Sequence, residues 1–142
     1  MLPILVATDG SSGADRAVDT AAELAKATAA PLVIVTVGGN ISGAQLRELA
    51  AAEGDLSKRL EADANEILER AKQRAARAGA SDIKLRSGWG DPSQVIIEAV
   101  LEEKADILVI GRRGRGLLSG LLLGSVSQKL ASLAPCKVIV VP

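Results

Sequence analysis

Histidine is absent from this chain of 142 residues, and its absence excludes whole classes of chemistry. Ser-His-Asp and Cys-His nucleophile systems, a histidine general base and histidine-ligated metals cannot be built. Cys136 is the only cysteine, so neither an internal disulfide nor a structural zinc site within one chain can form. Any catalysis would depend on carboxylates, lysines, hydroxyls or a bound metal. The composition therefore favours a binding protein.

The chain also lacks net charge and long apolar runs. Its 17 Lys and Arg residues balance 17 Asp and Glu residues, which argues against nucleic-acid and membrane-surface binding. No stretch approaches the roughly 20 apolar residues that span a bilayer. The first residues carry no basic segment before their short apolar run and are not typical of a secretory signal. We therefore expect a cytoplasmic protein with one globular domain over residues 1–142.

Short β-branched runs alternate with longer alanine-rich periodic runs. The expected strands are Ile4–Ala7, Leu32–Val37, Ile83–Ser87, Asp106–Gly111 and Lys137–Val141. The expected helices are Ser12–Thr28, a stretch within residues 44–78 that Gly54 interrupts, a helix beginning at Pro92, and Ser125–Leu133. Asp91, Pro92 and Gln94 predict an N-cap, a proline at the first helical position and a completed capping box. Five strands alternating with four helices predict an α/β, Rossmann-like doubly wound domain with a parallel sheet.

In such sheets, ligands bind beyond the carboxyl ends of the strands, where the strand order reverses. The residues that follow the first, second and fourth expected strands are Asp9 and Gly10, Gly38 after Val37, and the loop beginning at Gly111. Asp9 has two interpretations, as a carboxylate placed for a ligand or as a cap of the first helix. Val37 is a core valine whether or not it contacts a ligand, and Gly10 and Gly90 can serve turns alone.

The segment from Gly111 to Ser127 is the most informative part of the chain. It connects an apolar strand to a helix whose first turn contains Ser125 and Ser127. Glycines let backbone N–H groups approach an anion, and a helix N-terminus adds about half a positive charge. A polyphosphate cradle is one interpretation. A flexible glycine-rich connector, with the serines as plain helix caps, is the other.

Three other motifs do not fit this segment. A Walker A loop requires Lys and Ser or Thr after its last glycine, but Leu117 follows Gly116. The dinucleotide fingerprint requires a third glycine where this chain has Ser119, and no acidic residue follows at about twenty positions. Glycines spaced by four from Gly116 to Gly124 resemble a membrane-helix packing motif, but their apolar stretch is too short to span.

The same segment resembles the universal stress protein family, whose nucleotide signature is Gly-x2-Gly-x9-Gly-Ser/Thr. Gly111, Gly114, Gly124 and Ser125 have these identities at these spacings. The resemblance covers essentially the whole chain, including the opening 4–11, the Gly-Asp-Pro turn at 90–92 and the closing 135–141. It implies a five-stranded parallel sheet in the order 3-2-1-4-5 and membership of the ATP-binding branch of the family.

The resemblance also implies a set of nucleotide-binding residues. Asp9 is similar to the family's acidic residue near the ribose and phosphates, and Val37 to the residue that contacts adenine. The full expected set is Ala7, Asp9, Val37, Ile110, Gly111, Gly114, Gly124, Ser125, Val126 and Ser127. ATP is the expected ligand, with Mg²⁺ as its companion ion, and no catalytic residue is assigned.

Three functions stay open. The main prediction is an ATP-binding regulatory protein of the stress-response type. The alternatives are a slow Mg²⁺-dependent ATPase, in which Asp9 helps to place the metal, and a dimeric interaction module that does not require nucleotide. An apolar strand at the expected sheet edge, together with the family resemblance, predicts a homodimer joined through residues 136–141.

A few residues have no assigned role. Arg112, Arg113 and Arg115 either favour a triphosphate or face solvent or a partner chain. Trp89 is the only aromatic residue and is expected to pack structurally. Nothing is assigned to residues 38–54.

Overall fold

A computed structural model describes residues 2–38, 44, 47–48, 51, 54–112 and 124–142 of the chain. Strands and helices alternate along these ranges, as the sequence predicts. In chain order they are β1 (Ile4–Ala7), α1 (Ser12–Thr28), β2 (Leu32–Val37), α3 (Gly54–Arg77), β3 (Ile83–Gly88), α4 (Pro92–Glu103), β4 (Ile107–Gly111), α5 (Ser125–Leu133) and β5 (Lys137–Val141).

The five strands form one parallel sheet in the order β3-β2-β1-β4-β5. The predicted doubly wound α/β architecture and strand order are confirmed. Ile4 of β1 is in register with Leu32 of β2 on one side and with Ile107 of β4 on the other. The strand order reverses at the β1–β4 pair, so the carboxyl ends of β1, β2 and β4 lie together at the edge where such sheets bind ligands.

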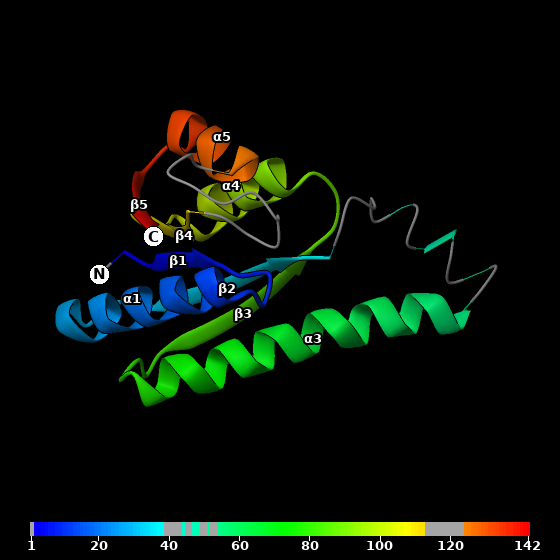
Figure 1. The fold of residues 1–142 in the computed structure, drawn as a ribbon, viewed down its shortest axis with the longest axis horizontal. Coiled ribbons are helices and arrows are strands. Elements are labelled where there is room, and N and C mark those ends of the chain that lie inside the picture. Colours follow the sequence, from blue (N-terminus) through cyan, green and yellow to red (C-terminus); the bar gives the residue numbers. More distant parts are fainter. Residues whose placement is uncertain (1, 39–43, 45–46, 49–50, 52–53, 113–123) are drawn as a thin grey trace.

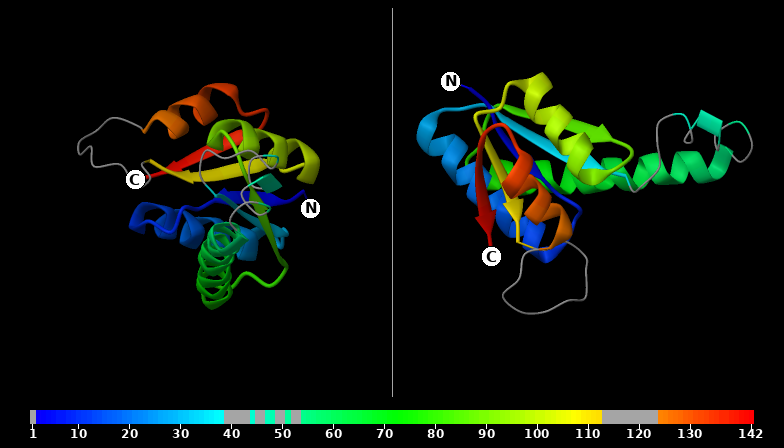
Figure 2. Two further views of the ribbon diagram at one scale, coloured as in Figure 1. Left: turned by 90° about the vertical axis from the view of Figure 1, so that its right-hand side faces the viewer. Right: turned by 90° about the horizontal axis from the view of Figure 1, so that it is seen from above.

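Helices cover both faces of the sheet, α1 and α3 on one face and α4 and α5 on the other (Figures 1 and 2). Successive strand residues point to opposite faces, which divides the core into two layers. In β1, Ile4 and Val6 pack in the layer under α1 and α3, and Leu5 packs in the layer under α4 and α5. β2 is buried on both faces, because both layers of helices cover it.

The helix α3 is longer than the sheet that it covers. Among the side chains of α3 described from residue 58 onward, the buried ones are Ala64, Leu68, Ala71 and Ala75. Its first turns extend past the body of the domain (Figures 1 and 2). The helix ends before Gly79, whose φ of +107° suits glycine, and Ala80 N donates to Ala75 O at 3.1 Å to close the last turn.

The N-terminus of α4 agrees with the sequence in part. Asp91 is the N-cap and accepts a hydrogen bond from Gln94 N, with Pro92 at the first helical position. The second half of the predicted capping box, a hydrogen bond from Asp91 N to the Gln94 side chain, is not formed among the described residues, where Gln94 Nε2 donates to Glu98 Oε1 at 3.4 Å. Side chains four residues apart lie on one helix face, which brings the Gln94 amide close to the Glu98 carboxylate.

Within the described ranges, none of the helices is long and apolar enough to cross a bilayer.

Candidate functional site

Two threonines join the ends of β1 and β2 in front of the candidate site. Thr8 N donates to Val35 O at 2.9 Å, and Thr36 Oγ1 donates to Thr8 O at 2.7 Å. Thr36 is only 2% exposed, so its hydroxyl must find a partner inside the protein. These bonds hold the backbone immediately before Asp9, although sequence reasoning assigned no role to either threonine.

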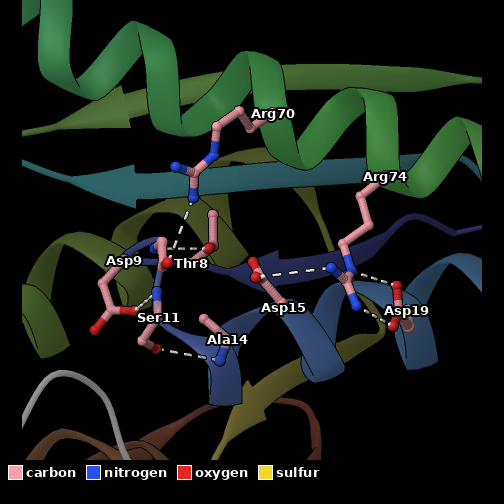
Figure 3. A network of polar contacts seen from close by, with 9 residues as sticks. Thr8, Asp9, Ser11, Ala14, Asp15, Asp19, Arg70 and Arg74 are labelled. Carbon is pink, nitrogen blue, oxygen red and sulfur yellow. Dashed lines mark hydrogen bonds and ion pairs between the residues drawn. The ribbon is translucent and has the colours of Figure 1, made fainter.

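Asp9 lies in the turn that connects β1 to α1, and its side chain organises that turn (Figure 3). Ser11 N donates to Asp9 Oδ1 at 2.9 Å, and Gly10 N donates to Thr8 Oγ1 at 3.1 Å. Gly10 has a φ of +81°, a conformation that glycine adopts without strain. Asp9 is half-buried, and its Oδ2 has no hydrogen bond to the described part of the chain.

The N-cap of α1 is Ser11, whose Oγ accepts from Ala14 N at 3.2 Å. The alternative interpretation of Asp9 as the cap of this helix is therefore wrong. Asp9 instead supports the turn through one oxygen, two residues beyond the carboxyl end of β1.

Four apolar residues of the expected site share one hydrophobic layer. Ile110 is buried in the layer beneath α4 and α5, and Ala7, Val37 and Val126 pack against that layer while staying half-buried. They come from β1, β2, β4 and the first turn of α5. The topology thus brings together residues that are far apart in the sequence and gives this edge an apolar surface.

The end of β4 is tied to α5 by hydrogen bonds. Ser127 Oγ donates to Gly111 O at 2.7 Å, and Ser127 is 6% exposed. Gly124 N donates to Arg112 O at 2.9 Å, and Arg112 N donates to Val141 O of β5 at 2.8 Å. Gly114, Arg113 and Arg115 lie outside the described residues.

The N-terminus of α5 differs from those of α1 and α4. Its N-cap is Gly124, which has no side chain to cap the helix, whereas Ser11 and Asp91 cap the other two. The first backbone hydrogen bond of the helix joins Gln128 N to Gly124 O at 2.9 Å. The N–H groups of residues 125–127 precede that bond, so they are the donors that a helix start leaves to other partners. Neither serine is the N-cap, and that alternative interpretation is wrong.

The backbone at Gly124 does not itself require glycine. Its φ is −65° and its ψ is 162°, values open to any residue. Ser, Asp or Asn would cap the helix better than glycine. The backbone conformation therefore does not explain the glycine, and no side chain caps the N–H groups of the first turn.

Two arginines of α3 approach the β1–α1 segment, and sequence reasoning singled out neither (Figure 3). Arg74 binds Asp19 of α1 through two hydrogen bonds of 2.7 and 2.9 Å and lies 3.7 Å from Asp15. Hydrogen bonding to Asp19 raises the pKa of Arg74. Arg70 NH2 donates to Gly10 O at 3.4 Å. Both arginines lie on an exposed, charge-rich helix face that carries no local signal of these contacts.

Among the described residues, no group of three or more His, Cys, Asp or Glu side chains could hold a metal ion. Asp9 is the acidic residue of the expected site.

The fold defines a doubly wound α/β protein whose candidate site lies at the strand order reversal. The chain belongs to the universal stress protein family, whose sequence profile matches residues 1–142. A universal stress protein of Mycobacterium tuberculosis is 35% identical over 138 residues, which cover 97% of this chain and 94% of that protein. A putative universal stress protein of Staphylococcus aureus is 32% identical over 139 residues, which cover 97% of this chain and 82% of that protein.

Solved structures of the family share the whole fold. A universal stress protein in complex with cAMP is 35% identical, with a TM-score of 0.78 over 99% of this chain and 97% of that one. A universal stress protein from Archaeoglobus fulgidus in complex with dAMP is 26% identical, with a TM-score of 0.75 over 100% of this chain and 98% of that one. UspA from Lactobacillus plantarum is 25% identical, with a TM-score of 0.82 over 99% and 97%.

Proposed function

We propose that this protein binds ATP as a regulatory protein of the stress-response type and acts as one domain. The nucleotide lies across the carboxyl edge of β1, β2 and β4. Family members solved with cAMP and dAMP support an adenine nucleotide as the ligand. Cytoplasmic location stays a prediction from the sequence.

The observation that carries this proposal is the uncapped N-terminus of α5. Gly124 has an ordinary backbone conformation, yet it supplies no capping side chain. Backbone N–H groups and the helix dipole at such a position attract phosphate. A glycine that the backbone conformation does not require is explained if a phosphate group takes the place of the missing cap.

The other residues of the expected site have distinct roles in this proposal. Val37, Ala7 and Val126 give the adenine ring an apolar surface, which suits a flat aromatic base. The Asp9 carboxylate accepts hydrogen bonds from the ribose hydroxyls. Ser125, which is exposed, offers its hydroxyl to phosphate. Ser127 acts through its backbone N–H, because its hydroxyl already donates to Gly111.

Mg²⁺ would enter this site with the nucleotide. Mg²⁺ commonly binds through one or two carboxylates and the phosphates of a substrate, and Asp9 is one carboxylate in position for such a role. A slow ATPase reaction would then depend on Asp9. Turnover that is proportional to protein concentration and absent in Asp9→Asn would support that alternative, and equal turnover in both would reject it.

Calorimetric titration with ATP, ADP, AMP, cAMP and GTP tests the proposal. We expect saturable binding of ATP by the wild type and at least a tenfold loss in Gly124→Asp. The new carboxylate caps the helix and repels phosphate from the same N–H groups. Because Asp is a better N-cap than Gly, the free energy of unfolding should stay equal or rise by a few tenths of a kcal/mol.

The matched control is Ser81→Asp, which adds the same charge at an exposed position before β3, at the amino end of the sheet. It should bind ATP as the wild type does. Absence of ATP binding by the folded wild type would refute the proposed function. Unchanged binding by Gly124→Asp would refute the assigned phosphate position.

We further propose a homodimer in which β5 of one chain pairs with β5 of a second. β5 is at the sheet edge, and its four valine and isoleucine residues stay half-exposed. Lys137 N donates to Asp106 O, and Val141 O accepts from Arg112 N, so the backbone groups of residues 137 and 141 face β4. Because backbone groups alternate along a parallel strand, those of Val138 and Val140 face outward and are available to a second chain.

This alternation gives a sharp test of the dimer. Val140→Pro removes an outward N–H, leaves the bonds to β4 intact and keeps an apolar side chain. The mass of Val140→Pro in solution should fall from that of a dimer to that of a monomer, while its circular dichroism spectrum shows that the secondary structure is retained. A wild-type monomer at micromolar concentration, or a dimer that Val140→Pro does not weaken, would refute pairing through β5.

A further inference from the structure

Arg70 contacts the same turn that holds Asp9. From α3 its guanidinium reaches the β1–α1 turn, where NH2 donates to the carbonyl oxygen of Gly10 at 3.4 Å (Figure 3). The contact is long and exposed, so on its own it adds little to stability. Its importance lies in which peptide group it contacts.

The Gly10 carbonyl and the Ser11 N–H belong to one peptide group. The described chain has no cis peptide bond, so this group is planar and trans, and its C=O and N–H point in opposite directions. The Ser11 N–H donates to Asp9 Oδ1 at 2.9 Å. Arg70 and the Asp9 carboxylate therefore bind the two ends of one peptide dipole.

A cation at the oxygen of a peptide group polarises its N–H and strengthens the hydrogen bond that the N–H donates. The cation also resists rotation of the peptide. This matters at Gly10, because glycine can adopt more backbone conformations than any other residue type. Both effects act on the orientation of the Asp9 carboxylate.

We propose that Arg70 is a positioning residue for Asp9, acting through the Gly10–Ser11 peptide. This inference rests on the proposed nucleotide site. Arg70 approaches the turn from the face covered by α1 and α3, whereas α5 covers the opposite face (Figures 1 and 3). Arg70 thus acts on the ligand through the peptide and the carboxylate.

Arg74 makes this arrangement stable. It lies four residues after Arg70 on the same helix face and binds Asp15 and Asp19 of α1. These ion pairs join α3 to the first turns of α1 beside the Arg70 contact. Arg70 is then held close enough to contact the turn.

The primary test compares ATP affinity in the wild type, Arg70→Gln and Arg70→Lys. We expect Arg70→Gln to bind about three- to tenfold more weakly, the range of one modest hydrogen bond. Arg70→Lys should recover most of this loss, since an ammonium group can donate to the same carbonyl. Arg77→Gln removes the same charge from an exposed position in the last turn of α3 and should bind as the wild type does.

Two further comparisons separate positioning from direct contact. In an Asp9→Ala background, Arg70→Gln should have no additional effect, because no side-chain oxygen remains to accept from Ser11 N. The loss caused by Arg70→Gln should also be equal for AMP and ATP. Additive losses, or a loss that grows with the number of phosphates, would overturn the proposal.

Hydrogen exchange measured without ligand tests the role of Arg70 independently of nucleotide binding. The amide hydrogen of Ser11 should exchange faster in Arg70→Gln than in the wild type and Arg77→Gln, at equal global stability. Failure of the wild type to bind any nucleotide would refute the proposed function. Wild-type binding together with unchanged affinity and Ser11 exchange in Arg70→Gln would refute the role of Arg70 alone.

Discussion

The hydroxyl of Ser127 donates to the carbonyl oxygen of Gly111 at 2.7 Å and so joins the first turn of α5 to the last residue of β4. The two residues are 16 positions apart and frame the glycine-rich segment of the sequence. This bond closes the base of that segment. It gives Ser127 a structural role that Ser125, two residues earlier and exposed, does not share.

The two serines should therefore respond differently to substitution. Ser127→Ala leaves the Gly111 carbonyl without its partner, and we expect the free energy of unfolding to fall by about 1–2 kcal/mol. Ser125→Ala should leave stability within about 0.5 kcal/mol and weaken ATP binding. Urea denaturation and calorimetry measure the two effects. Equal stability of both variants would contradict the structural role of Ser127.

The ion pair between Arg74 and Asp19 should contribute modestly to stability. Both side chains are partly exposed, at 40% and 36%, so solvent screens the pair. We expect Arg74→Gln to lower the free energy of unfolding by about 0.5–1 kcal/mol. In the double variant with Asp19→Asn the two losses should be less than additive, and the coupling should shrink in high salt. Fully additive losses would show that the pair contributes nothing.

Glu103 should make stability depend on pH in the acid range. Hydrogen bonds from Lys84, with that from Arg86 adding to it, hold the pKa of Glu103 below its usual 4.5, although burial opposes this. A carboxyl whose pKa is lowered by folding stabilises the protein above its unfolded pKa, and that contribution is lost as the pH falls through the folded pKa. Below about pH 4.5, the free energy of unfolding should therefore fall.

Chemical denaturation between neutral and acid pH measures this dependence. Glu103→Gln should flatten the acid part of the profile by about 1 kcal/mol and leave the rest of its shape similar. Glu66→Gln, at an exposed position of α3, is the matched control and should reproduce the wild-type profile. A Glu103→Gln profile as steep as that of the wild type would assign the acid sensitivity to other groups.

Substitutions at Trp89 and Gly38 should be strongly coupled in their effects on the free energy of unfolding. A Cβ placed on Gly38 would overlap the indole ring of Trp89, so Gly38→Ala must displace the ring. We expect a loss of about 1–3 kcal/mol, typical of overpacking, and a shift in fluorescence from the only aromatic residue. In a Trp89→Ala background, Gly38→Ala should cost much less. An equal loss in both backgrounds would place the strain elsewhere.

Much of the fold follows from local sequence pattern. The bounds of β1, α1, β2, α5 and β5 coincide with the predicted ranges, because apolar strand runs and capping residues are local signals. The position of β3 and β5 at the two edges also agrees with prediction. The strand order itself came from the family resemblance, since local pattern does not determine which strands pair.

The errors and omissions concern hydrogen-bond partners. Gln94 has the right identity for a capping box, but its side chain donates a hydrogen bond to Glu98. Thr36 is the one polar residue of β2, which was an available signal, yet its partner Thr8 is 28 positions away. The contact between Arg70 and Gly10 spans 60 positions. Such contacts depend on the packing of α3 against the β1–α1 turn, and sequence spacing carries no record of that packing.

The expected site is assembled from three stretches of chain: residues 7–9, residue 37, and residues 110–127, of which the structure describes 110–112 and 124–127. No single stretch keeps this arrangement when the chain unfolds, so a ligand held by all three binds the native state alone. Its concentration then enters the folding equilibrium directly, and at one hundred times its dissociation constant it adds about 2.7 kcal/mol. For such a protein, thermal resistance would follow the supply of nucleotide in its surroundings.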